Sequence, residues 1–143
     1  MTAQEMWKQC GGHGAYETVG FGDGSEADVL ADLVLQGKKR ATTSAYYWIQ
    51  SGEDKLPRSG DCCVVLDSKH NAVCVIKTTR VYVTEFCKVS AEHAALEGEG
   101  DHSLDYWRRE HRRFFSEDLA GTGQAFSDDM LVVCEEFEKV FPV

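Results

Sequence analysis

LPRSGDCCVVLDSKHNAVCVIKTTRVYVTEF, residues 56–86, has the pattern of two β-strands with turns around them. The turn residues 57–60 precede an apolar run over 62–66, and DSKHN has the composition of a second turn. Residues 73–83 are rich in Val, Ile, Thr and Tyr, which pack well on a pleated surface. The sequence therefore predicts strands over 62–66 and 73–83.

Helices are predicted on both sides of these strands. Before them, Ser25 is the expected N-cap of an amphipathic helix, and Gly37 is placed to end it. After them, Ser90 and Ser103 are expected to cap two further helices. One face of the last helix gathers the residues Leu104, Trp107, His111, Phe114, Phe115 and Leu119, and its arginines tend to fall elsewhere.

The two ends of the chain complete the expected fold. The closing segment DDMLVVCEEFEKVFPV predicts strands over 130–134 and 137–141. Strands at both ends of a helical insertion favour an α+β fold, a small mixed β-barrel with helices around it, over a parallel α/β sheet. The opening TAQEMWKQCGG predicts a short helix, so we expect residues 1–15 to form a helical extension and residues 16–143 the main domain.

Composition excludes several classes of protein. The chain has 143 residues, of which 43% are hydrophobic, and this fits one domain with a substantial core. Its formal net charge of -9 argues against non-specific binding to duplex DNA or an anionic membrane. The six cysteines form no CxxC pair, and no signal-peptide pattern opens the chain, so free thiols in the cytoplasm are expected. Cys62 and Cys63 point to opposite faces of a strand, and no metal site or other cofactor is predicted.

The stretch GKKRATTS, residues 37–44, concentrates positive charge in this acidic chain. If it is extended after the helix, Lys39, Ala41 and Thr43 point to one side, and Arg40, Thr42 and Ser44 point to the other. A lysine beside hydroxyl groups can bind phosphate, or act as a base when burial lowers its pKa. The alternative is a solvated cationic helix end, where the helix dipole favours Lys38 and its neighbours.

The stretch EGEGDHS, residues 97–103, places three carboxylates in a glycine-broken loop between two helices. Glu97, Glu99 and Asp101 can converge there on a ligand, and carboxylates that lie close together form an acid/base pair. The alternative is an acidic linker whose charges stabilise the N-terminus of the next helix. His111 lies on the apolar face of that helix, which is more typical of a core histidine than of a metal ligand.

Aromatic residues follow the cationic stretch, at Tyr46, Tyr47 and Trp48. Such rings can stack a nucleobase while neighbouring Lys and Arg groups contact phosphate or ribose. The alternative is that Tyr47 and Trp48 pack in the core or at its rim.

Taken together, GKKRATTS, PRSGDCCVVLD, VCVIKTTRVYVTEF and HAALEGEGDHSLDYWRREHRRFF resemble the ASCH family of small domains related to the PUA domain. The motifs have the family's order and spacing, and the resemblance covers residues 18–142. It implies a PUA-like β-barrel with helices around a ligand cleft, which GKKRATTS lines on one wall and EGEGD on the other.

The resemblance also implies a set of site residues. A shorter bacterial branch of the family removes an acetyl group from cytidine with a Lys, a Thr and a Glu. By position these match Lys39, Thr42 and either Glu97 or Glu99, although the EGEGDHS loop is longer here. Around these catalytic candidates, the expected substrate-binding residues are Lys38, Arg40, Thr43, Ser44, Tyr47, Trp48, Asp101 and Arg108.

Two classes of function follow from the resemblance and the charge pattern. The first is a hydrolase, acting on a modified nucleoside such as acetylated cytidine, with Lys39 as base and Thr42 as nucleophile. The second is a binding module that recognises single-stranded or modified RNA without chemistry. A ribonuclease is a further alternative, because some family members have been described as ribonucleases. The acidic net charge favours a small ligand over a long RNA.

Overall fold

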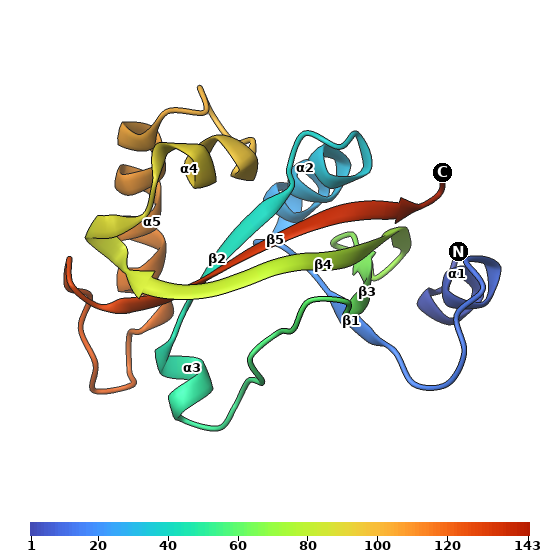
Figure 1. Ribbon diagram of the computed structural model, residues 1–143, viewed down its shortest axis with the longest axis horizontal. Coiled ribbons are helices and arrows are strands. Elements are labelled where there is room, and N and C mark those ends of the chain that lie inside the picture. The colour runs from blue at the N-terminus through green and yellow to red at the C-terminus, as the bar shows by residue number, and fades with distance from the viewer. The chain divides into compact units, whose positions relative to one another are not determined.

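The computed structural model describes residues 1–143, and the chain forms two compact units. Unit 1 contains residues 1–40, 58–80 and 136–143, and unit 2 contains residues 41–57 and 81–135. Five strands and the helices between them make a mixed α+β fold, as predicted, with the strand order β1-β3-β4-β5-β2 (Figure 1). The two longest strands, β4 (Ala72–Glu85) and β5 (Leu131–Phe141), each contribute to both units.

Unit 1 is built on the strand pair predicted from residues 56–86. Strand β3 (Cys62–Leu66) runs antiparallel to β4, with Val64 opposite Val75, and the short β1 (Glu17–Val19) pairs with β3 in parallel. The prediction for 62–66 is confirmed, and β4 is longer than predicted by one residue at its start and two at its end. The two strands predicted at the C-terminus are one continuous strand, β5.

Helices cover both faces of this strand pair, because neighbouring residues of a strand point to opposite sides. On one face, the core joins α2 (Gly24–Leu35) through Leu30 and Val34 to Val65 of β3. On the other, Met6 of α1 (Ala3–Gln9) packs with Val64 and Val75. The alternation of the strand residues thus builds two core layers from one hairpin.

The ends of α2 set the start of the GKKRATTS segment. Gly37 has a φ of 76°, and the amides of Gly37 and Lys38 bond back to the carbonyls of Val34 and Leu33. This is a Schellman ending, which requires a left-handed residue and so favours glycine, as predicted. The predicted N-cap was wrong: Asp23 precedes the helix, and its carbonyl accepts the first helical hydrogen bonds.

Unit 2 contains the second half of GKKRATTS, residues 41–44, and the whole of EGEGDHS. Strand β2 (Ala41–Ala45) is followed by a single helical turn, α3 (Tyr47–Gln50). After β4 come the 3-10 turn η1 (Phe86–Lys88) and the helices α4 (Ala91–Glu97) and α5 (Leu104–Asp118). The predicted caps Ser90 and Ser103 are confirmed, because each hydroxyl accepts a hydrogen bond from an amide in its helix's first turn.

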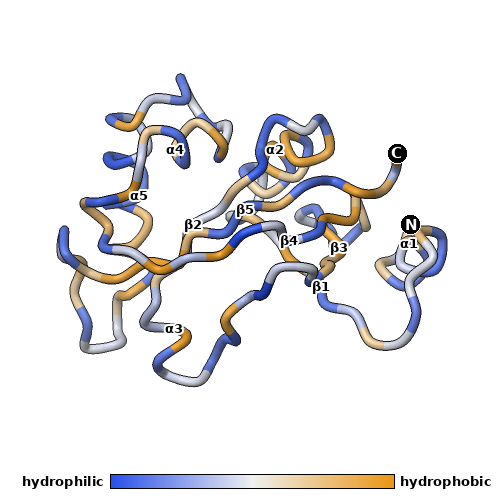
Figure 2. Tube along the Cα trace, in the orientation of Figure 1, coloured by the Kyte–Doolittle hydropathy of each residue, from blue (hydrophilic) through white to orange (hydrophobic).

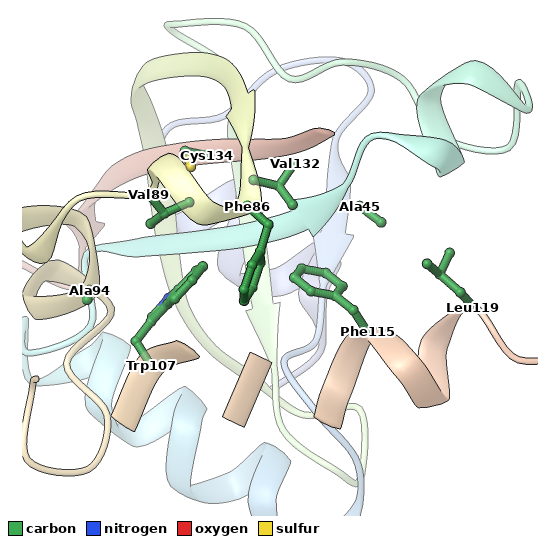
Figure 3. Packing of buried hydrophobic residues seen from close by; sticks show 9 residues of the cluster. All are labelled: Ala45, Phe86, Val89, Ala94, Trp107, Phe115, Leu119, Val132 and Cys134. Carbon is green, nitrogen blue, oxygen red and sulfur yellow. The ribbon is translucent and has the colours of Figure 1, made fainter. Parts of the chain in front are cut away.

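The core of unit 2 lies along the apolar face of α5. Trp107 stacks on Phe86 with ring centroids 5.2 Å apart, and Phe115 and Leu119 continue the row toward Ala45 (Figure 3). Hydrophobic and hydrophilic residues alternate along the α5 tube in Figure 2, as an amphipathic helix requires. Phe114, predicted on the apolar face, is 48% exposed and lies outside this core.

Candidate functional site

Strand β2 presents alternate side chains to the protein interior. Thr43 and Ala45 are buried, whereas Thr42 is half-buried and Ser44 is exposed. The same alternation begins before the strand, where Lys39 is buried and Arg40 is exposed. The predicted two-sided pattern of GKKRATTS is confirmed, and it turns Thr43, not Thr42, into unit 2.

Polar side chains converge on the carboxylate of Glu97, at the C-terminal end of α4. Glu97 is 2% exposed, so its polar atoms depend on protein partners. The Thr43 hydroxyl donates to Oε2 at 2.7 Å, and the indole N–H of Trp107 donates to the same oxygen. A buried carboxylate that accepts such bonds keeps its charged form more easily than an isolated one.

His93 is the second partner of the Thr43 hydroxyl. Its Nε2 lies 2.7 Å from Thr43 Oγ1 and 3.4 Å from Glu97 Oε2. Since Thr43 gives its only hydrogen to Glu97, Nε2 must carry a hydrogen and donate to Thr43. Nδ1 of this buried ring has no hydrogen-bond partner. A bare lone pair there costs less than an unpaired N–H, which agrees with the neutral Nε2–H tautomer.

His111 completes the cluster from α5. Its Nδ1 lies 2.9 Å from the Trp107 carbonyl and must donate to it, because a carbonyl oxygen only accepts. Its Nε2 lies 3.4 Å from Glu97 Oε2. A second hydrogen on the ring converts that contact from repulsion between lone pairs into a charge-assisted hydrogen bond. At 3.4 Å this contact is near the upper limit for a hydrogen bond, and protonation of His111 gives Glu97 a charged partner.

The electrostatics of His111 agree with this geometry. Burial disfavours the imidazolium and lowers the pKa of His111, but the hydrogen bond and the charge of Glu97 outweigh it, so the pKa is raised above 6.5. The Trp107 carbonyl and the charge of Glu99 act in the same direction. The ring also stacks on Trp107 at 4.2 Å, and its side chain remains 14% exposed.

This cluster can move a proton. A hydroxyl that donates to a carboxylate has its base in place, and the carboxylate is in turn held by a partly exposed histidine. Thr43 is 6% exposed, Glu97 is 2% exposed, and the side chain of His111 is 14% exposed. His111 is therefore the member of this trio that solvent reaches most easily.

The cations of the GKKRATTS stretch belong to unit 1. Lys39 belongs to unit 1, where it is 2% exposed and its Nζ lies 5.4 Å from the centre of the Phe21 ring. Lys38 and Arg40 are exposed beside it. The cationic stretch is therefore divided between a buried lysine and two exposed cations.

The other predicted loop and aromatic residues have several different environments. Asp101 is exposed, and hydrogen bonds from the Ser103 hydroxyl and amide lower the pKa of its carboxyl, so the linker interpretation fits it. Glu99 is half-buried in the same loop. Trp48 donates to Asp118 at 2.8 Å, and its ring meets that of Tyr47 edge-on.

The last predicted binding residue, Arg108, lies on the side of α5 that faces η1. It is half-buried, and its guanidinium contacts the carbonyl of Cys87 at 3.4 Å. A distance of 3.4 Å is near the upper limit for a hydrogen bond, and this contact leaves most of the N–H donors of Arg108 available.

Three members of the cluster were not among the predicted site residues: His93, Trp107 and His111. Two pairs at i, i+4 spacing, His93 with Glu97 and Trp107 with His111, could have indicated them, because residues four apart share a helix face. The prediction considered only histidine pairs. Thr43 was predicted to bind substrate, and the resemblance favoured its neighbour Thr42 as nucleophile.

The cysteines give a prediction that is independent of this site. Cys87 is exposed, whereas Cys74 and Cys134 are buried, and burial raises the pKa of the Cys74 thiol to about 11. Because the thiolate is the reactive form, iodoacetamide at pH 8 should label Cys87 first and spare Cys74 and Cys134 in the folded protein. Peptide mass spectrometry measures this, and early labelling of Cys74 would contradict the described burial.

Metal-binding clusters and membrane-spanning helices are both absent from the chain. No group of three or more His, Cys, Asp and Glu side chains has a geometry that could hold a metal ion. No helix combines the length and the apolar character needed to cross a membrane.

Comparisons with known proteins agree with this architecture. The family model described as ASCH domain matches residues 17–141. A crystal structure of an ASCH domain from Lactobacillus crispatus JV V101 is 34% identical, covers 96% of this chain and 92% of its own, and superposes with a TM-score of 0.89. A protein from Enterococcus faecalis V583 is also 34% identical, with coverage of 96% and 84% and a TM-score of 0.83.

A more distant likeness extends the fold comparison. The crystal structure of a hypothetical protein, 19% identical, covers 79% of this chain and 93% of its own with a TM-score of 0.51, which shows a similar fold alone. No curated protein matches the chain. The predicted PUA-like α+β fold is confirmed by the two closer structures.

Proposed function

Because this chain belongs to the ASCH domain family, whose PUA-like fold often binds RNA, we propose that it binds a nucleoside, free or within single-stranded RNA, and hydrolyses an acyl group from its base. One observation carries the proposal. The Thr43 hydroxyl, 6% exposed, lies 2.7 Å from both Glu97 Oε2 and His93 Nε2. A hydroxyl between a carboxylate and an imidazole is the arrangement of an activated nucleophile.

The proposed reaction uses Glu97 as base and then as acid. As Thr43 Oγ1 bonds to the acyl carbon, its proton passes to Glu97. The protonated Glu97 then gives that proton to the departing exocyclic nitrogen as the carbon–nitrogen bond breaks, leaving an acyl-threonine. Water next attacks the acyl carbon, Glu97 takes its proton, and the Thr43 oxygen leaves with that proton while the carboxylic acid is released.

Two further residues support these steps in the proposal. His93 donates from Nε2 to Thr43 Oγ1, which orients the oxygen lone pairs for attack and release. His111 holds the charge of Glu97 through its contact at 3.4 Å. The role of Lys39 as base stays a prediction of the family resemblance.

The neighbouring threonines provide the test. Turnover of acetylated cytidine by mass spectrometry should fall by about 10³-fold or more in Thr43→Val, since the nucleophile is lost while volume and branching are kept. Thr42→Val, the matched control one residue away, should stay within about threefold of wild type, because its side chain points to the other side of the strand. Lys39→Ala should lower turnover as well.

The reverse pattern would overturn the proposal. If Thr42→Val loses activity and Thr43→Val keeps it, the nucleophile is Thr42, as the family resemblance implies. If neither acetylated cytidine nor an acylated short RNA is turned over, the hydrolase is excluded and binding without chemistry remains.

A second candidate function, an RNA-binding module without chemistry, is favoured by the arginines of α5. Arg112 and Arg113 are 52% and 69% exposed, and Arg109 lies over the Tyr106 ring at 5.7 Å. Residues 108–113 of α5 carry four arginines and one glutamate in a chain of net charge -9. Of these arginines, Arg112 pairs with Asp128 and Arg113 with Glu110. Local positive charge of this kind attracts phosphates in spite of an acidic protein.

This candidate has its own measurement. Replacing Arg109 and Arg113 by Gln should weaken binding of a short single-stranded RNA and reduce the slope of log K against log salt by about one to two. Turnover of the free nucleoside should not change. An unchanged salt slope would exclude α5 as the RNA-binding surface.

A further inference from the structure

A pocket of about 400 Å³ lies at the other end of α5 from the Glu97 cluster, entirely within unit 2. The chain lines it from α3, from the end of β2, from the loop after α5 and from the start of β5. Figure 3 shows Ala45 and Leu119, two of its lining residues, at one end of the core and Trp107 at the other. Trp107 and Leu119 are separated by 12 residues of helix, or about 18 Å along the axis.

The lining of this pocket mixes polar and apolar residues and carries no Asp, Glu, Lys, Arg or His. In a chain with 27% charged residues this selects against ions, because a phosphate, carboxylate or ammonium group would find no countercharge. Ala45, Leu119 and Met130 supply apolar surface, and Tyr46 and Tyr47 supply rings. The complementary ligand is uncharged, with an apolar or aromatic face.

Three polar side chains of the lining are not committed within the protein. The hydroxyl of Tyr46 and the side-chain amides of Gln50 and Gln124 form no hydrogen bond to another protein group. Each glutamine amide offers two donors and an acceptor, which can pair with an edge that has both kinds of group. Such an edge on a flat apolar ring describes a nucleobase.

Hydrogen bonds hold the walls of the pocket in place. Trp48 Nε1 donates to Asp118 Oδ2 at 2.8 Å and ties α3 to the end of α5, and the Tyr46 amide donates to the Leu131 carbonyl at 3.1 Å. In the loop after α5, the Thr122 hydroxyl donates to the Leu119 carbonyl at 2.6 Å and accepts from the Gln124 amide at 3.1 Å. A preformed pocket loses less conformational entropy on binding.

We propose that this pocket binds an uncharged nucleobase of single-stranded RNA, as a second subsite in addition to the Thr43–Glu97 site. The ligand class rests on the proposed function, and the pocket itself rests on its own lining. Ala45 follows Thr43 by two residues on the same side of β2, about 7 Å along the strand. An RNA with one residue at Thr43 therefore has the pocket within reach of another of its bases.

The test is an NMR titration of the full ¹⁵N-labelled chain with cytidine, uridine, adenosine, guanosine and ribose. At least one nucleoside should shift the side-chain amide signals of Gln50 and Gln124 in a saturable way, and ribose should not. Ala125→Phe, which fills the pocket from its exposed loop, should weaken that binding at least tenfold. Ala120→Phe, an exposed alanine that does not line the pocket, is the matched control and should stay within twofold.

The outcomes separate this proposal from the hydrolase. If no nucleoside shifts the two amides, if ribose shifts them equally, or if only signals around Thr43 respond, the pocket is not a base-binding subsite. Saturable shifts that Ala125→Phe abolishes support it even where acetylated cytidine is not turned over. In an active protein, Ala125→Phe should leave turnover of the free nucleoside unchanged and weaken only the binding of short RNA.

Discussion

Replacing Glu97 by Ala should destabilise the protein by about 3–5 kcal/mol, the cost of removing one member of a buried, hydrogen-bonded charge pair. The substitution leaves the Thr43 hydroxyl, the Trp107 indole and the His111 imidazolium without their shared acceptor. Each buried donor without an acceptor costs free energy, and the methyl group of alanine fills little of the space. A loss of this size lowers the thermal midpoint by about 10 °C or more.

Urea unfolding of the wild type and of Glu97→Ala measures this loss. An unchanged m-value shows that the two proteins expose the same amount of surface on unfolding. Glu92→Ala is the control, because Glu92 is an exposed carboxylate in the first turn of the same helix. Its loss removes only an interaction with the helix dipole, about 0.5 kcal/mol. Equal effects of the two substitutions would show that Glu97 is not the centre of a buried network.

The stability that His111 contributes should depend on pH. Its folded-state pKa is raised above 6.5. Burial lowers this pKa, but the hydrogen bond and the charge of Glu97 together raise it by more. A raised pKa means that the folded state holds the proton more tightly than the unfolded state. The contribution is therefore fully present below about pH 6.5, and it is lost as the pH rises through the folded-state pKa.

The measurement is the difference in unfolding free energy between wild type and His111→Gln, taken from pH 5.5 to 9. This difference should be largest at the acidic end and shrink toward pH 9, and the wild-type imidazole should titrate by NMR with a midpoint above 6.5. In Glu97→Gln the midpoint should fall, because the neutral amide no longer favours the imidazolium. His70→Gln, at an exposed turn of unit 1, controls for the removal of a histidine. A wild-type midpoint below 6.5 would contradict the charged partnership of His111 with Glu97.

The two predictions differ in what they test about the proposed hydrolase. Loss of stability in Glu97→Ala shows that the carboxylate is a structural centre, whether or not it also takes a proton from Thr43. A buried network can be retained for structure alone. For this reason the nucleophile is tested with Thr43→Val and Thr42→Val, which leave Glu97 and its partners on α5 in place.

Local sequence patterns determined most of the secondary structure. The apolar run between two turns predicted the strand over 62–66, and the hydroxyl caps Ser90 and Ser103 predicted the starts of α4 and α5. Each depends on interactions within a few residues, which a sequence displays directly. The error at Ser25 is of the same local kind, since Asp23 and Ser25 are both acceptable caps and only the backbone path chooses between them.

The candidate site was determined only in part. The resemblance indicated Glu97, and strand and helix periods indicated the two-sided character of β2 and the place of His111 on the apolar face of α5. It favoured Thr42 over Thr43 because a resemblance by position does not show to which side of a strand a side chain points. The choice of Thr43 as the partner of Glu97 belongs to the fold, since it joins residues 54 positions apart in the chain.

By itself, the sequence determined the family, the α+β class and the residue types available for chemistry. Tertiary structure alone decided that Thr43, His93, Trp107 and His111 meet around Glu97, and that an uncharged pocket forms at the far end of α5. The physical reason is that helix and strand periods fix which residues share a face of one element. Which faces then meet depends on packing between segments distant in the chain, and no local pattern records it.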